Sequence, residues 1–284
     1  MKIALVTDTH LSPRDALLAE NWRAVDRWID AQGAELVVHL GDITADGVGD
    51  AAELVHARQL IARAGRDVLF LPGNHDIGDG PGDDGAVSHE GPVRPERLAD
   101  FRRLFGPDFW SLDVEGWQLL GLNAQLFGAG GDEEGRQWAW LDEALARGAG
   151  PVGVFCHKPL ALAEPAAARA RTRYPIAPAR AKLSARLARR DLRFVASGHV
   201  HQALGVVTDG VEHVWVPSCA FIMPDVVQAP VGEKRVGVVL LEIWPGGHRF
   251  SSGAPAGLVR HNLLDLTHIY PQVADWGTGG DGRP

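Results

Sequence analysis

Apolar and polar positions follow two different periods along the first half of the chain. Continuous apolar runs of strand length lie at residues 2–7 (KIALVT), 35–40 (ELVVHL) and 67–71 (DVLFL). Between them, apolar side chains recur at helical spacing, which predicts amphipathic helices over about residues 14–31 and 50–64. A run that is apolar at every position is typical of a strand buried on both faces. The alternation predicts a layered α/β core whose strands pair at least partly in parallel.

The second half is richer in strand patterns. A short helix is predicted over about residues 95–105, and another lies around Trp138. The predicted strands are 117–123, 152–156, 192–196, 203–208, 211–216 and 236–243. Asp209-Gly210 stands between two of these strands, and such a pair favours a tight hairpin. The second half is therefore predicted to be mostly β-structure.

Two segments break these patterns. Residues 77–95 are rich in Gly, Pro and Asp and have no periodicity, which indicates either a lid over a site or a disordered insertion. The C-terminal extension, about residues 257–284, is apolar enough to pack on the core or on a second subunit, and it ends in a Gly-rich tail. Because no internal repeat and no clean linker is found, residues 1–284 are interpreted as one domain.

Composition limits the classes of function. The hydrophobic fraction of 45% and charged fraction of 23% are those of a globular protein. The net charge of −8 argues against a nucleic-acid polymer or an anionic membrane as partner. It does not argue against a small phosphorylated substrate, because a metal ion can supply positive charge locally. The first apolar run is too short for a secretory signal, and Cys156 and Cys219 suggest no disulfide framework, so the cytoplasm is the expected location.

Polar residues follow five of the predicted strands directly. We call the residues that directly follow a strand its exit. The five exits are Asp8-Thr9-His10, Gly41-Asp42, Gly73-Asn74-His75-Asp76, His157 and Gly198-His199-Val200-His201. Ligands bind at the carboxyl ends of strands in open α/β sheets. Residues two apart in an extended segment point to the same side, so Asp8 and His10 are expected to bind one ion together, and His199 and His201 are expected to face one site together. Carboxylate, imidazole and amide donors suit Mn²⁺, Fe or Zn²⁺, and their number suits two ions about 3.5–4 Å apart.

This series of motifs, in this order, resembles the calcineurin-like metallophosphoesterases, and is most similar to the bacterial class III cyclic-nucleotide and glycerophosphodiester phosphodiesterases. The resemblance implies a four-layer α/β/β/α sandwich with two mixed β-sheets. It also implies two metal ions, with Mn or Fe favoured and Zn open. The residues that it implies for one ion are Asp8, His10 and His201, and those for the other are Asn74, His157 and His199. Asp42 would bridge the ions, and His75 would contact the substrate phosphate, beside Asn74, or protonate the leaving oxygen.

The implied reaction is hydrolysis of a small phosphodiester by in-line attack of a metal-bridging hydroxide, with Asp42 and His75 as the catalytic residues. The alternative is a phosphomonoesterase acting on a small metabolite or a phosphoprotein. A nuclease is disfavoured by the net charge, and a non-catalytic metal-binding scaffold remains a further alternative. Homo-oligomerisation is left open.

Several other polar residues receive weaker predictions. Asp76 orients His75 or caps its turn, Asn123 lies near the site or serves a turn, and Asp46 is interpreted as structural. The remaining histidines so interpreted, as core or surface residues, are His39, His56, His213 and His248. The arginines of one Ala/Pro-rich segment are predicted to lie in a solvated loop, with a phosphate clamp as the alternative: Arg169, Arg171, Arg173 and Arg180. Acidic residues in and beside the 77–95 loop disfavour a highly anionic substrate: Asp79, Asp83, Asp84, Glu90 and Glu96.

Overall fold

Two β-sheets form the centre of the protein. The computed structural model describes residues 1–62, 65–83, 85, 88–161, 163 and 172–278. The first sheet has five strands in the order β12-β11-β1-β2-β3: Gly247–Gly253, Val238–Trp244, Lys2–Val6, Leu36–His39 and Val68–Phe70. Its strands β1, β2 and β3 are parallel, while β11 is antiparallel to both β1 and β12.

The second sheet has six strands. Their order is β4-β5-β6-β7-β9-β8: Trp110–Val114, Trp117–Leu122, Val152–Cys156, Leu192–Ser197, Val211–Trp215 and Leu204–Thr208. The four central strands are parallel, and β4 and β8 are antiparallel edges. Asp209 and Gly210, at φ 52° and 80°, form the tight turn between β8 and β9, which confirms the predicted hairpin. A small parallel pair joins β10 (Phe221–Ile222) to β13 (His261–Asn262).

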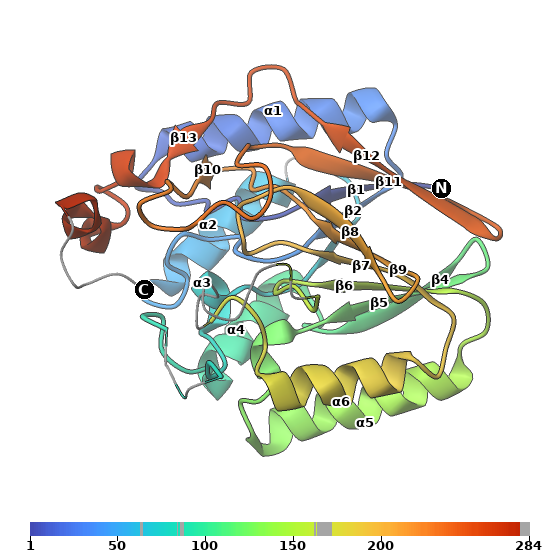
Figure 1. The fold of residues 1–284 in the computed structure, drawn as a ribbon. Coiled ribbons are helices and arrows are strands. Elements are labelled where there is room, and N and C mark those ends of the chain that lie inside the picture. The colour runs from blue at the N-terminus through green and yellow to red at the C-terminus, as the bar shows by residue number, and fades with distance from the viewer. Residues whose placement is uncertain (63–64, 84, 86–87, 162, 164–171, 279–284) are drawn as a thin grey trace.

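Helices cover the two outer faces of the paired sheets (Figure 1). Those packed on the first sheet are α1 (Ala16–Gln32), α2 (Ala51–Ala62) and α4 (Pro95–Phe105). Those packed on the second sheet are α5 (Gly131–Arg147) and α6 (Ala177–Leu187). Short helices are α3 (Asn74–Ile77), η1 (Ala124–Leu126), η3 (Leu263–Asp265) and η4 (Pro271–Thr278). The predicted α/β/β/α sandwich with two mixed sheets is confirmed.

The continuous apolar runs are explained by burial on both faces. In β1, Ile3 and Leu5 point into the core between the sheets, while Ala4 and Val6 pack under the helices. All four side chains are completely buried. Because neither face meets water, no polar residue interrupts the run until the strand ends.

Two strands of the large sheets, β4 and β12, were not among the sequence predictions, and neither was the outer helix α6. The C-terminal extension packs on the chain itself as far as Val273, in a cluster with Leu18 of α1 and Phe221 of β10. None of the helices in the described residues is both long and apolar enough to cross a membrane.

Candidate metal centre

The exits of β1, β2, β3, β6 and β7 meet at one end of the sandwich. Backbone hydrogen bonds continue past the strands and hold the exits together. Asp8 N donates to Gly41 O (2.9 Å), His10 N donates to Asp42 O (3.1 Å), and Gly198 N donates to His157 O (2.9 Å). The side chains that follow these strands are therefore fixed relative to one another by the sheets.

The backbone at the exits is left-handed. The expectation that Asp8-x-His10 and His199-x-His201 are extended is wrong, because φ is 51° at Asp8, 45° at His10, 68° at His199 and 55° at His201. Asp42 has φ 50°. Each such conformation costs an L-residue of order 1–3 kcal/mol and persists where surrounding structure imposes it. The side chains of each pair still reach the same centre, because the left-handed backbone turns them toward it and not because they alternate along an extended strand.

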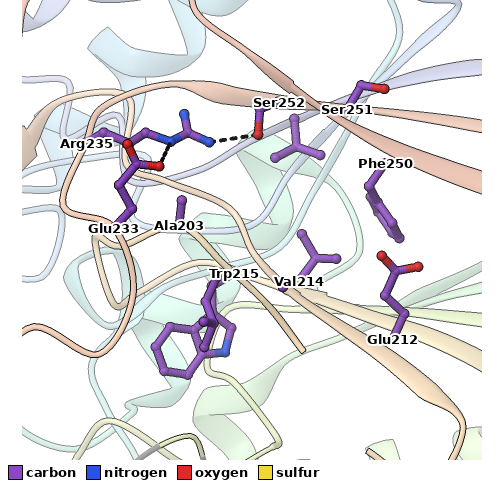
Figure 2. Close-up of a pocket in the computed structure, with 12 residues that line it drawn as sticks. Ala203, Glu212, Val214, Trp215, Glu233, Arg235, Phe250, Ser251 and Ser252 are labelled. Carbon is purple, nitrogen blue, oxygen red and sulfur yellow. Dashed lines mark hydrogen bonds and ion pairs between the residues drawn. The ribbon is translucent and has the colours of Figure 1, made fainter. Parts of the chain in front are cut away.

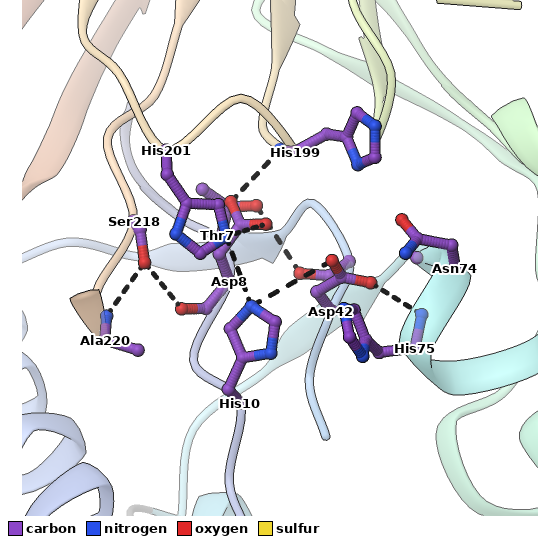
Figure 3. A network of polar contacts seen from close by, with 12 residues as sticks. Thr7, Asp8, His10, Asp42, Asn74, His75, His199, His201, Ser218 and Ala220 are labelled. Carbon is purple, nitrogen blue, oxygen red and sulfur yellow. Dashed lines mark hydrogen bonds and ion pairs between the residues drawn. The ribbon is translucent and has the colours of Figure 1, made fainter. Parts of the chain in front are cut away.

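Asp8, His10 and His201 form the first group of candidate ligands. Their nearest nitrogen and oxygen atoms lie within 4.8 Å of one another. His201 Nε2 is 3.2 Å from His10 Nε2 and 3.5 Å from Asp8 Oδ1 (Figure 3). All three residues are buried. The structure thus brings together the residues predicted for one ion.

Asp42, His157 and His199 form the second group, with Asn74 beside them. His157 Nε2 lies 3.2 Å from Asp42 Oδ2, 3.1 Å from His199 Nδ1 and 3.2 Å from Asn74 Oδ1. Asp42 Oδ2 is also 4.0 Å from His10 Nε2 in the first group. Asp42 therefore stands between the two groups, as a bridging ligand must.

In three of the candidate ligand histidines, the ring nitrogen Nδ1 makes a hydrogen bond on the side away from the centre. The partners of the Nδ1 atoms are Tyr270 Oη at 2.7 Å for His10, Phe221 O at 2.9 Å for His201, and Leu40 O at 2.9 Å for His157. Such contacts fix a ring's orientation and tautomer. The Nε2 atoms are consequently the ones that face the centre.

The donors fit metal ions on three counts. They are oxygens and imidazole nitrogens without thiolate, a set suited to Mn, Fe or Zn. Asp8 Oδ1 is buried without a hydrogen-bond partner in the protein, which is unfavourable unless a cation or other group pairs with it. Burial is the larger cause that lowers the pKa of His10 and of His199 well below the usual value, and the charge of a neighbouring histidine lowers it further. Both are therefore neutral imidazoles, the form that binds metals.

Asp42 and His157 influence each other strongly. Burial would lower the pKa of His157, but the charge of Asp42 and the hydrogen bond between them raise it to about 9. Burial would raise the pKa of Asp42, yet His157 and His75 hold it well below its usual range. Asp42 is thus a charged carboxylate, stabilised by the histidines beside it.

Gly73 allows β3 to approach Asp42 closely. A Cβ atom at this position would lie 2.1 Å from Asp42 Oδ1. The φ of Gly73 is −104°, so the requirement is one of space and not of backbone conformation. Gly198 likewise allows the segment after β7 to approach the end of β1 closely, because a Cβ atom at this position would lie 2.0 Å from Thr7 Oγ1.

His75 lies at the edge of the centre. Its backbone N donates to Asp42 Oδ1 (2.9 Å), and its ring Nδ1 lies 2.8 Å from Ala45 O. Its Nε2 is 3.3 Å from Glu90 Oε1. Burial would lower the pKa of His75, but Asp42 and Glu90 outweigh it and raise the pKa.

Comparison with known proteins supplies the family. Residues 1–203 match the family model for calcineurin-like phosphoesterases. The chain belongs to this family. No curated protein matches the chain in sequence.

Solved structures share the fold of this calcineurin-like phosphoesterase. A dimetal phosphatase from Danio rerio is 15% identical, with a TM-score of 0.61 over 90% of this chain and 96% of that chain. The purple acid phosphatase PPD1 of yellow lupin (Lupinus luteus) seeds is 14% identical, with a TM-score of 0.65 over 92% and 52%. GAP50, the anchor in the inner membrane complex of Plasmodium, is 12% identical, with a TM-score of 0.61 over 95% and 94%. Identities this low establish a common fold and leave substrate open.

Two contacts to the candidate ligands of this phosphoesterase were not predicted. Glu90 Oε1 lies 3.0 Å from Asn74 Nδ2, and Tyr270 Oη reaches His10. Glu90 also forms a third group with His75 and His89, whose atoms lie within 4.8 Å of one another. Glu90 had been noted only as an acidic residue of the loop, and Tyr270 lies in the C-terminal extension, for which only packing was predicted. No local pattern connects either residue with a strand exit.

Asp76 holds two exits of the phosphoesterase together. Its carboxylate accepts hydrogen bonds from the backbone N atoms of Gly73 (2.9 Å), Ile43 (3.1 Å) and Thr44 (2.9 Å). The pKa of Asp76 is raised to about 6, mainly by burial and secondly by the charge of Asp42. Between the two alternatives, these contacts favour a capping role over orientation of His75.

The other polar residues considered lie apart from the centre or serve the backbone. Asn123 caps η1 and donates to Asp108 Oδ2 (2.9 Å), and Asp46 accepts from Gly49 N (3.0 Å). His39 is buried, hydrogen-bonded to Thr9, and both cysteines are buried and free. The solvated loop predicted for the arginines is wrong where the structure describes them, because Arg173 is buried and Arg180 lies in α6. Arg180 packs over the ring of Tyr174 and pairs with Asp83, while Arg169 and Arg171 lie outside the described residues.

A separate cavity of about 280 Å³ lies between the edges of the two sheets (Figure 2). Val214, Trp215 and Phe250 line it together with polar residues, among them Arg235, which donates to Glu233 and Ser252. None of the candidate metal ligands lines this cavity. The cavity is therefore not part of the candidate metal centre.

Proposed function

We propose that the protein is a two-metal phosphodiesterase that hydrolyses small phosphodiesters of the cyclic-nucleotide or glycerophosphodiester type. The observation that carries the proposal is the position of Asp42, whose Oδ2 lies 3.2 Å from His157 Nε2 and 4.0 Å from His10 Nε2. One carboxylate faces both groups of donors. Asp8, His10 and His201 would hold one ion, Asn74, His157 and His199 would hold the other, and Asp42 would bind both.

Each side chain has a separate task in this proposal. Two bound metal ions, with Mn or Fe favoured and Zn open, neutralise the charge of a phosphate ester and lower the pKa of water. The backbone N of His75 holds Asp42 Oδ1, so that Oδ2 remains for the centre. His75 also presents its ring beside the centre, where it contacts the phosphate or gives a proton to the leaving oxygen. Its Nδ1 is engaged by Ala45 O, so Nε2, which lies 3.3 Å from Glu90 Oε1, is the ring nitrogen that would make that contact.

The charge around His75 supports a diester over a monoester. Glu90 Oε1 lies 3.3 Å from His75 Nε2, and the Glu90 side chain is only 5% exposed. A phosphomonoester dianion carries one more negative charge than a diester, so a buried carboxylate beside His75 repels it more strongly. This agrees with the expectation that acidic residues of the 77–95 segment disfavour highly anionic substrates.

The fold alone does not establish catalysis, because GAP50, described as an anchor, has a similar fold. The decisive experiment compares kcat/KM for bis(p-nitrophenyl) phosphate and p-nitrophenyl phosphate, using protein reconstituted with Mn²⁺. We expect a strong preference for the diester. A monoester preference would replace the proposal with a phosphomonoesterase. Turnover of neither compound, with two ions bound, would favour a metal-binding scaffold.

A further inference from the structure

Glu90 contacts the amide of Asn74 from a segment outside the strand exits. Its Oε1 accepts a hydrogen bond from Asn74 Nδ2 at 3.0 Å, across 16 positions of sequence. Glu90 is 8% exposed, in a segment where most other described residues between α3 and α4 lack regular structure. A buried carboxylate is thus placed directly behind a candidate metal ligand.

The chemistry of the two groups fixes the orientation of the amide. An ionised carboxylate only accepts hydrogen bonds, so the NH₂ end of Asn74 must face Glu90. The opposite end, Oδ1, then faces the second group of ligands, 3.2 Å from His157 Nε2. A metal ion binds the amide oxygen and not the NH₂ group. If the Asn74 amide were reversed, its NH₂ group would face the second group of ligands in place of Oδ1.

We propose that Glu90 is a positioning residue that turns the amide oxygen of Asn74 toward the second metal ion. The inference rests on the proposed function, since it takes Asn74 as a ligand. Without an acceptor at position 90, both amide orientations become accessible, and the ion bound by Asn74, His157 and His199 is held less tightly.

The loop is anchored firmly enough for this role. Arg97 Nη1 donates to the backbone O of Glu90 (3.1 Å), and Asp79 N donates to Gly91 O (2.8 Å). The same Glu90 Oε1 lies 3.0 Å from His89 Nε2 and 3.3 Å from His75 Nε2. These contacts hold both the backbone and the carboxylate of Glu90 in place.

The test is a calorimetric titration of the metal-free protein with Mn²⁺, for wild type, Glu90→Ala and Glu90→Gln. Glutamine retains an acceptor oxygen for Asn74 Nδ2, whereas alanine removes it. We expect two ions in each protein, with one of them bound about 10- to 100-fold more weakly in Glu90→Ala. Glu90→Gln should remain within about threefold of wild type. Glu96→Ala controls for the loss of a nearby negative charge, because Glu96 is exposed on α4.

Three results would overturn the inference. Equal affinities in wild type and Glu90→Ala would show that Glu90 does not position Asn74. Three ions in wild type, with one lost in Glu90→Ala, would show that the group of His75, His89 and Glu90 is itself a metal site. An equal loss in Glu96→Ala would assign the effect to net charge. Fewer than two ions in wild type would instead contradict the proposed function, which keeps the two failures distinct.

Discussion

The hydroxyl oxygen of Tyr270 lies 2.7 Å from Nδ1 of His10, although the two residues are 260 positions apart. Tyr270 is 4% exposed and packs with Ile269 and Phe221. His10 Nε2, on the other side of the ring, faces His201 at 3.2 Å. The C-terminal extension thus supports a candidate metal ligand, beyond the residues that match the family model.

We predict that Tyr270→Phe weakens the binding of one ion by about tenfold, because His10 loses the group that orients its ring. Phenylalanine keeps the packing of the aromatic ring, so the fold should be retained. Calorimetric titration with Mn²⁺ measures the change. Tyr174→Phe alters the only other tyrosine, in a different cluster, and should leave metal binding unchanged. Wild-type affinity in Tyr270→Phe would refute the positioning role.

Asp42→Asn tests the bridging carboxylate. Asparagine has the same size but lacks the charge that two cations share, so we expect kcat/KM for the diester to fall by about 100-fold or more. Steady-state kinetics at saturating Mn²⁺ measure this loss. Asp46→Asn is the matched control, since the Asp46 carboxylate is half-exposed and caps Gly49. Undiminished turnover in Asp42→Asn would remove the two-metal assignment.

Gly73→Ala tests the close approach of β3 to Asp42. The added Cβ atom would lie 2.1 Å from Asp42 Oδ1, so the carboxylate or the strand must move. We expect unfolding free energy to fall by about 1–3 kcal/mol and one metal ion to be lost. Urea unfolding and metal analysis measure the two effects. Gly135→Ala is the control, because nothing lies within 4 Å of its added Cβ atom and Ala is favoured in the α5 helix.

Glu90→Gln tests the electrostatic basis of the diester preference. Removing the charge while keeping the shape should raise kcat/KM for p-nitrophenyl phosphate relative to the diester by about tenfold. The ratio of the two kcat/KM values in variant and wild type measures the shift. An unchanged ratio would mean that this carboxylate does not select substrate charge.

Most of the sandwich is predictable because its strands are buried on both faces. An unbroken apolar run such as Val152–Cys156 marks such a strand directly. The strands of the two large sheets that were missed lie at sheet edges. In β4, buried or half-buried positions alternate with exposed ones, and β12 is a polar sequence with glycines at both ends. Glu115-Gly116, at φ 51° and 77°, is a hairpin turn between β4 and β5 and was the available signal for β4.

The candidate ligands are predictable for a related reason. Each one follows a recognisable strand within a few residues, so the strand pattern also locates the ligand. The supporting residues have no such marker. Glu90 lies in an aperiodic segment and Tyr270 lies near the far end of the chain, so their contacts depend on long-range packing. The left-handed backbone at Asp8 and His10 was missed because a strand period carries no information beyond the strand's last residue.

The central claim is that one carboxylate joins two metal ions, and EPR spectroscopy of the Mn²⁺-loaded protein tests it most directly. We expect two Mn²⁺ per chain with the signal of an exchange-coupled pair, and loss of the coupling in Asp42→Asn. A single ion per chain, or two ions with uncoupled signals in the wild-type protein, would contradict it.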